Sequence, residues 1–189
     1  KKKGFSGKAI LSVSLLNDKN VLTVSVNSFG ISESPVDCSI ESVSSDKTDE
    51  TISHVSFEKD TSKISLTDAE LVVSAGRGLK GAENWGMVDE LAEALGAATA
   101  CSKPVSDIGW RPHHEHVGQT GIAISPNLYI AIGISGAIQH LAGVSSSKTI
   151  VVINTDPEAP FFKAADYGIV ADAFEVVPKL VAAVKAAKG

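Results

Sequence analysis

The sequence has two cysteines and one methionine among 189 residues, and aromatic side chains make up 5% of it. Cys38 and Cys101 are too few for a disulfide scaffold or a cysteine-rich zinc site, and a reducing intracellular compartment fits them best. No apolar run reaches the roughly 18 residues that a membrane span needs. Collagen, coiled coils and fully disordered chains are also excluded, because 43% of the residues are hydrophobic and 21% are charged.

Positive charge is also scarce, since 17 Lys and Arg face 22 Asp and Glu and the net charge is −5. A protein that follows the phosphates of a nucleic acid needs clustered basic side chains, so we expect no nucleic-acid partner. The basic cluster at residues 1–3 leads into no hydrophobic signal core. The sequence does not start with Met, and we expect it to begin partway through a longer protein.

Residues 1–68 are rich in Ser and poor in Gly. Apolar and polar side chains alternate in residues 9–15 and 22–26, which is typical of half-buried strands, and the polar stretch 17–20 between them predicts a hairpin turn. Further strands are predicted at residues 39–43, 54–57 and 63–66. We find no catalytic constellation in this segment, and the isolated His54 is expected to be structural or at the surface.

From residue 69 on, short β-branched runs alternate with helical patterns. Strands are predicted at residues 71–75, 98–101, 128–134, 149–153 and 167–170. Helices are predicted at residues 84–97, 137–142, 161–165 and 177–188. In the last of these helices, Pro178 suits the first turn. Apolar strands that alternate with helices indicate an α/β fold with a doubly wound parallel sheet, at residues 69–189, preceded by a β-rich segment at residues 1–68.

Glycine and polar residues follow every predicted strand of this sheet, where doubly wound folds bind their ligands. Residues 76–81, Gly-Arg-Gly-Leu-Lys-Gly, fit the G-x-G-x-x-G pattern of a phosphate-binding turn. Residues 133–137, Gly-Ile-Ser-Gly-Ala, allow close backbone approach at the start of a helix. Each loop also has a plainer explanation, a tight turn for the first and an N-cap by Ser135 for the second. Together they suit a dinucleotide.

These residues leave the kind of nucleotide open. The NAD version of the motif expects an acidic residue after the next strand, where this chain has Ser102 and Lys103. A lysine there suits the additional phosphate of NADP, so an NADP-dependent oxidoreductase is one alternative. A non-catalytic nucleotide sensor is another. The histidines of residues 113–116 lack the further ligands of a tetrahedral zinc site, so we expect no metal.

Five motifs follow one another in the second part of the chain. They are Val-Gly-Gln-Thr-Gly at 117–121, Leu-Tyr-Ile-Ala at 128–131, Gly-Ile-Ser-Gly-Ala-Ile-Gln-His-Leu-Ala-Gly at 133–143, Asn-Thr-Asp-Pro-Glu-Ala-Pro at 154–160 and Ala-Asp-Tyr-Gly-Ile-Val-Ala-Asp at 165–172. In this order they resemble the α subunit of electron-transfer flavoproteins. The resemblance extends over about residues 69–187, and residues 1–68 resemble more loosely the last strands of that family's N-terminal domain.

The resemblance implies a tightly bound FAD and a β subunit that helps to close the site. It implies an electron carrier rather than an enzyme with its own substrate, because the FAD carries the redox chemistry. The family accepts electrons from flavin dehydrogenases, including the acyl-CoA dehydrogenases of fatty acid β-oxidation, and passes them to a membrane quinone oxidoreductase. The implied compartment is the mitochondrial matrix, or the cytoplasm of a bacterium.

The resemblance also assigns cofactor contacts. Arg77 is expected at the pyrophosphate, His140 at the N1–O2 edge of the flavin, and Asn154 and Asp172 at the adenosine end. The other predicted FAD-binding residues are Ser102, Lys103, His116, Gln119, Thr120, Ser135, Gly136 and Gln139. A donor at the N1–O2 edge stabilises the negative charge of the reduced flavin.

Two of these positions depart from the family pattern. Lys103 stands where the family usually has Arg, and His116 where it often has Gln. Lysine keeps the positive charge but lacks the planar face of a guanidinium, so we expect the departures to change the flavin potential rather than the binding.

Overall fold

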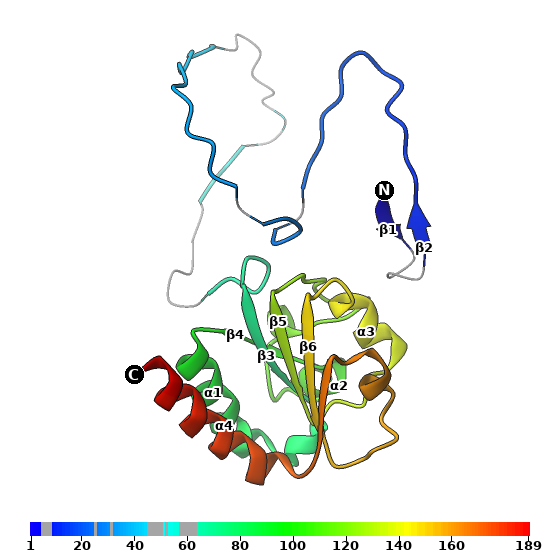
Figure 1. Ribbon diagram of the computed structural model, residues 1–189, viewed down its shortest axis with the longest axis vertical. Coiled ribbons are helices and arrows are strands. Elements are labelled where there is room, and N and C mark those ends of the chain that lie inside the picture. Colours follow the sequence, from blue (N-terminus) through cyan, green and yellow to red (C-terminus); the bar gives the residue numbers. More distant parts are fainter. Residues whose placement is uncertain (5–8, 25, 31, 45–50, 52, 57–63) are drawn as a thin grey trace.

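The computed structural model describes residues 1–4, 9–24, 26–30, 32–44, 51, 53–56 and 64–189. Among these, every buried residue lies at or after Ala69. The described residues before it are drawn in Figure 1 mostly without regular elements, and a folded α/β unit follows them along the chain. No helix of the described part is long and apolar enough to cross a membrane.

A five-stranded parallel sheet forms the centre of the folded unit (Figure 1). Its strands are β3 (Leu71–Ala75), β4 (Ala98–Cys101), β5 (Leu128–Ile132), β6 (Thr149–Asn154) and β7 (Tyr167–Val170). They lie in the order β4-β3-β5-β6-β7, and all neighbours are parallel. After β3 the chain continues to β4 on one side of β3, and it then crosses to β5 on the other side of β3. The carboxyl ends of β3 and β5 therefore form a topological switch point, the usual ligand site of such a sheet.

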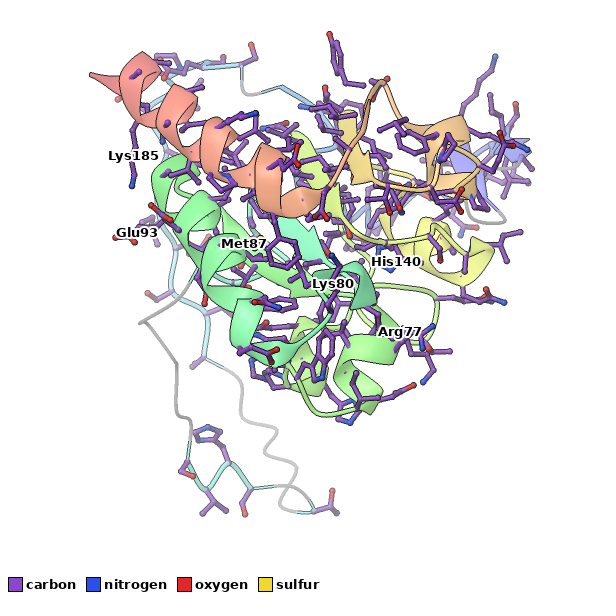
Figure 2. The ribbon with its side chains drawn as sticks, turned by 90° about the horizontal axis from the view of Figure 1, so that it is seen from below. Arg77, Lys80, Met87, Glu93, His140 and Lys185 are labelled. Carbon is purple, nitrogen blue, oxygen red and sulfur yellow. The ribbon has the colours of Figure 1, made fainter. Side chains whose placement is uncertain are left out.

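Helices cover both faces of the sheet. They are α1 (Gly86–Leu95), α2 (Lys103–Asp107), α3 (Ile138–Val144) and α4 (Ala173–Lys188), with the short 3-10 helices η1 (Arg77–Leu79), η2 (Ala82–Trp85), η3 (His113–Glu115) and η4 (Pro160–Ala164). Successive strand residues point to opposite faces. On one face Val73 and Ile130 pack against α1 and α4, which lie side by side in both views (Figures 1 and 2). On the other face Tyr129 and Val152 pack against α3 and η4.

The fold class and the five strands predicted after residue 69 are confirmed, with shifts at the ends of elements. β5 ends at Ile132, not at residue 134, because Gly133 has a φ of 59° and turns the chain out of the sheet. α4 begins at Ala173, four residues before the predicted start, because Asp172 Oδ1 accepts a hydrogen bond from Phe174 N at 3.0 Å and caps the helix. Pro178 therefore lies inside α4 and not in its first turn.

The other predicted helices are also present with changed limits. The helix predicted at residues 84–97 is divided into η2 and α1, and it ends before Gly96, whose φ of 73° gives a left-handed cap. The helix predicted at 161–165 is the 3-10 helix η4. The alternative explanation of residues 133–137 as an N-cap by Ser135 does not hold, since α3 begins at Ile138 with Ala137 in the cap position.

Most strands predicted before residue 69 are not formed. The structure contains β1 (Lys2–Gly4) paired antiparallel with β2 (Ala9–Leu11), so the strand predicted at 9–15 is only partly present. The strand predicted at 39–43 and the described parts of those at 22–26, 54–57 and 63–66 have no strand structure; residues 25, 57 and 63 lie outside the described residues. Residues 17–19 bend, with Asn20 Nδ2 donating to Asn17 O at 2.6 Å, but the bend joins no paired strands.

The reason for these errors is physical. An alternating pattern yields a strand only where another strand and a covering layer are present to pair and bury it. Here Leu16 and Val21 are 91% and 96% exposed, and Ile40 is 90% exposed, so nothing in the described structure covers their apolar side chains.

Candidate functional site

A pocket of about 470 Å³ lies at the switch point between β3 and β5, at the sheet edge where the sequence predicts a ligand. Four loop segments line it, each following or approaching the carboxyl end of β3, β4 or β5. They contribute Gly76, Arg77, Ser102, Lys103, Pro104, His116, Val117, Gly118, Gln119, Thr120, Gly133, Ile134, Ser135, Ala137, Gln139 and His140. The volume is within the usual range of small-molecule sites.

Two glycine loops cross each other at the base of this pocket. Gly76 N donates to Ile132 O at 2.9 Å, and Gly78 N donates to Gly133 O at 3.1 Å. A Cβ built on Gly78 would lie 2.6 Å from Gly133 Cα, and one on Gly76 would collide with Gly133 O. The first two glycines of the G-x-G-x-x-G sequence are therefore required by the contact between the two loops. The loops form one rigid cradle rather than two separate turns.

The second loop is fixed from behind by η4 and β6. Gly136 has a φ of 82°, and a Cβ there would lie 2.5 Å from Phe161 Cβ. Phe161 N donates to Ser135 O at 3.1 Å, and Asn154 Nδ2 donates to Ile134 O at 3.0 Å. Gly136 and Asn154 shape the loop, and neither lines the pocket.

His140 lies on α3 and is 6% exposed. Its Nε2 is 2.8 Å from the hydroxyl oxygen of Tyr129, and its ring packs edge-on against Phe161 with the ring centres 5.6 Å apart. Its Nδ1 is buried and has no hydrogen-bond partner among the described residues. Burial, helped by the nearby His116, lowers the pKa of His140 to about 4. The imidazole is therefore neutral at pH 7, and Nδ1 has no hydrogen bond to any described residue.

His116 forms another part of the wall and is also 6% exposed. Its backbone continues the edge of β4, since Val117 N donates to Cys101 O at 3.0 Å. The loop before it is held by Arg111, which donates from Nε and Nη2 to the two carboxylate oxygens of Glu115 at 2.7 and 2.6 Å. Burial lowers the pKa of His116, and the positive charge of Lys103 lowers it further.

Charged and amide side chains stand at the rim of the pocket. Arg77 is exposed, and Lys103 pairs with Asp107 across one turn of α2, with Nζ 3.2 Å from Oδ1. Gln119 is exposed while its N–H donates to Gln139 O at 2.7 Å, which ties this loop to α3. Arg77 in η1 and His140 in α3, both labelled in Figure 2, line the pocket.

Asp172 lies outside the pocket, at the start of α4. Its side chain caps the helix and pairs with Lys80, whose Nζ is 3.3 Å from Oδ2. The backbone N–H of Phe174, together with the ammonium of Lys80, lowers the pKa of this carboxyl. Lys80 belongs to the first glycine loop, so Asp172 is joined to the cradle through one ion pair.

The structure thus brings together all the predicted site residues except Gly136, Asn154 and Asp172. Sequence reasoning missed Tyr129, because a tyrosine in an apolar strand gives no signal of the side chain it contacts. It also missed Gly118, whose φ of 154° and close approach to α3 place the loop. No three His, Cys, Asp or Glu side chains of the described residues are grouped closely enough to hold a metal ion. His113 Nδ1 instead lies 2.7 Å from Ser106 Oγ.

A parallel sheet with two glycine loops at its switch point defines the class of dinucleotide-binding α/β domains. Residues 65–145 match the family described as the electron transfer flavoprotein FAD-binding domain. This part of the chain therefore matches the FAD-binding domain of electron transfer flavoprotein α subunits.

Three relatives show how far the similarity extends. The electron transfer flavoprotein subunit alpha of Syntrophomonas wolfei is 57% identical over 120 residues, 64% of this chain and 38% of that protein. The mitochondrial one of Dictyostelium discoideum is 52% identical over 130 residues, 69% of this chain and 37% of that protein. The one of Bacillus subtilis is 45% identical over 179 residues, 93% of this chain and 55% of that protein. The chain therefore spans between about two fifths and about half of these relatives.

Proposed function

We propose that this chain supplies the FAD site of a two-subunit electron carrier. It pairs with a β subunit, accepts electrons from flavin dehydrogenases such as acyl-CoA dehydrogenases, and passes them to a membrane quinone oxidoreductase. The compartment proposed is the mitochondrial matrix, or the bacterial cytoplasm. The observation that carries the proposal is the pocket at the β3–β5 switch point, because its wall contains a buried imidazole nitrogen with no partner among the described residues.

The residues of the pocket fit a flavin dinucleotide. When bound, FAD supplies the electron-accepting ring, which a side-chain set of this kind does not provide. We propose that Arg77, exposed at the rim, pairs with the pyrophosphate, since its guanidinium suits bidentate phosphate contact. His140 and Ser102 offer hydrogen bonds to the polar edge of the ring, and the ammonium of Lys103 favours added negative charge there.

The remaining predicted contacts fall into two groups. Gln119, Thr120, Ser135 and Gln139 are exposed on the pocket wall, and together with buried His116 we propose them for the ring or the ribityl chain. Asn154 and Asp172 follow β6 and β7 along the same edge of the sheet, and we propose them for the adenosine end. Asn154 already supports loop 133–137, and Asp172 already caps α4, so each would combine a structural and a binding role.

The experiment is a visible absorption spectrum of the purified chain, followed by chromatography of the ligand released by heat. We expect a flavin spectrum and released FAD. A colourless preparation is titrated with FAD, FMN and NADPH, alone and with the β subunit, and binding is measured by calorimetry. Binding of NADPH without any binding of FAD would overturn the proposal in favour of an NADP-dependent oxidoreductase. The pairing of Lys103 with Asp107 leaves the lysine less available for an NADP phosphate.

A further inference from the structure

A lysine of the first glycine loop reaches the start of α4. Lys80 Nζ lies 3.3 Å from Asp172 Oδ2 and 5.0 Å from the centre of the Phe174 ring. The two residues of this ion pair are 92 positions apart in the sequence, and they belong to the loops that follow β3 and β7. The strands β5 and β6 lie between β3 and β7 in the sheet, so Lys80 connects two loops that are not neighbours.

The backbone of Lys80 has a conformation that a lysine rarely adopts. Its φ is 67°, in the left-handed region, and its N–H donates to Arg77 O at 2.9 Å to end η1. Among the described residues, Asn27 is the one other non-glycine with a positive φ. Glycine would adopt this conformation without strain, yet the position holds a long cationic side chain. Such an exception points to a use for that side chain.

The carboxylate that Lys80 contacts is held at both of its oxygens. Asp172 Oδ1 accepts a hydrogen bond from Phe174 N at 3.0 Å, and Oδ2 accepts the one from Lys80 Nζ. The N–H of Phe174, together with the ammonium of Lys80, lowers the pKa of the carboxyl, so it is charged at neutral pH. Each carboxylate oxygen has a second lone pair, and the Asp172 side chain is 36% exposed, so it can still accept hydrogen bonds from a ligand.

We propose that Lys80 is a positioning residue for the adenosine half of the bound dinucleotide, because it holds the Asp172 carboxylate where the adenosine can donate hydrogen bonds to it. This inference rests on the proposed function, which assigns the pyrophosphate to Arg77 and the adenosine end to Asp172. Lys80 lies in the same loop as Arg77 and contacts Asp172, so one side chain links the two proposed contacts. An ionised acceptor that is held in place makes stronger and more selective hydrogen bonds than a mobile one.

The ion pair is measured first, on the ligand-free chain. The pKa of the Asp172 carboxyl is followed by NMR with ¹³C-labelled aspartate, and its signal is assigned by its loss in Asp172→Asn. Lys80→Met keeps a similar side-chain length without the charge, so we expect a higher Asp172 pKa in this variant than in the wild-type chain. Lys80→Arg should keep the pKa low. The same Asp172 pKa in Lys80→Met and the wild type would overturn the inference, because the lysine would then not hold the carboxylate in solution.

The consequence for binding is measured by calorimetric titration with FAD. Lys80→Met should weaken FAD binding about two- to fivefold, the effect expected for the loss of an exposed ion pair, and Lys80→Arg should bind FAD like the wild type. Lys148→Met is the matched control. Lys148 is exposed directly before β6, at the edge of the sheet opposite to the pocket, so this variant loses the same charge without a change at the site. Equal FAD affinity of Lys80→Met and the wild type would contradict the positioning role.

A second substitution tests whether the lysine acts through the carboxylate. Asp172→Asn keeps a side chain that can cap α4 but removes the charge. If Lys80 acts by holding Asp172, Lys80→Met should weaken FAD binding much less in the Asp172→Asn background than in the wild-type background. The same fold-change in both backgrounds would show that the ammonium contacts a phosphate directly, and it would overturn the inference.

These measurements separate the inference from the proposed function. A wild-type chain that binds no FAD, with or without the β subunit, overturns the proposed function and with it the role of Lys80 in FAD binding, while the NMR titration still decides whether the ion pair forms. A chain that binds FAD equally well with and without the charge of Lys80 overturns the inference alone.

Discussion

Buried histidines give this domain a stability that depends on pH. The pKa of His140 is 6.5 in the unfolded chain and about 4 in the folded chain. Between these values the unfolded chain binds more protons, so the free energy of unfolding falls as the pH falls. The contribution is complete above pH 6.5 and is lost by about pH 4. His116 acts in the same direction, because burial also lowers its pKa.

We predict that His140 accounts for up to about 3 kcal/mol of this loss. Denaturant unfolding of the wild-type chain and of His140→Gln between pH 4.5 and 7.5 measures it. The slope of stability against pH should be smaller in the variant. His54→Gln is the control, since His54 is exposed and should leave the slope unchanged. Equal slopes in His140→Gln and the wild type would show that the buried imidazole is not the titrating group.

Lys103 permits a second prediction for a single residue. Its side chain is 57% exposed and pairs with Asp107, so its charge is partly neutralised and screened. In Lys103→Arg, a planar guanidinium can stack on the ring of the bound FAD. We expect this contact to stabilise the negatively charged reduced form by about 0.5–1 kcal/mol more than the oxidised form. The potential of the bound FAD should therefore rise, by about 10–20 mV for two electrons. Redox titration of the FAD-loaded proteins measures the potential, and Lys179→Arg on α4 is the control. Identical potentials in Lys103→Arg and the wild type would refute the prediction.

At the scale of elements, one glycine determines how the loop before α3 lies on η4. Gly136→Ala would force an alanine into a φ of 82° and place its Cβ 2.5 Å from Phe161 Cβ. We expect a loss of about 2–4 kcal/mol in the free energy of unfolding. Gly86→Ala is the matched control, because α1 has open space at that position and alanine favours helices by up to about 1 kcal/mol. Denaturant unfolding measures the stability of both variants. If Gly136→Ala were as stable as Gly86→Ala, the contact between Gly136 and Phe161 would not determine the position of the loop.

The same element scale shows what the sequence could predict. The strands β3, β4, β5 and β6 are found because their apolar runs are mostly buried. The loops after them converge because parallel strands end at one edge of the sheet. The ends of β5 and α4 are missed because they depend on a glycine turn at Gly133 and a cap at Asp172. The site prediction fails at Tyr129 for a related reason: its partner His140 is defined by packing, not by spacing in the sequence.

At the scale of the whole molecule, the described chain has two unlike parts. Residues from 69 on contain all the buried side chains of the described structure, and α4 is joined to α1 by packing and by the ion pair of Lys185 with Glu90. The segment before them meets this unit at a few points, among them the hydrogen bonds from Ser125 Oγ to Val26 O at 2.7 Å and from Asn27 Nδ2 to Ala69 O at 3.2 Å. These observations support the proposed boundary after residue 68. Strands before it were predicted wrongly because sequence alternation does not specify a pairing partner.

The backbone bonds between the glycine loops have a consequence for how a ligand enters. Gly78 N donates a hydrogen bond to Gly133 O, and Gln119 N donates one to Gln139 O. Main-chain hydrogen bonds therefore connect three walls of the pocket, which are the two glycine loops and the loop that contains Gln119. Such walls do not part without breaking these bonds, and entry must occur past the side chains at the rim. The binding energy is then not spent on ordering loops, which is the advantage of a preorganised receptor. Association should behave as a single step, its rate proportional to ligand concentration without a plateau set by loop opening.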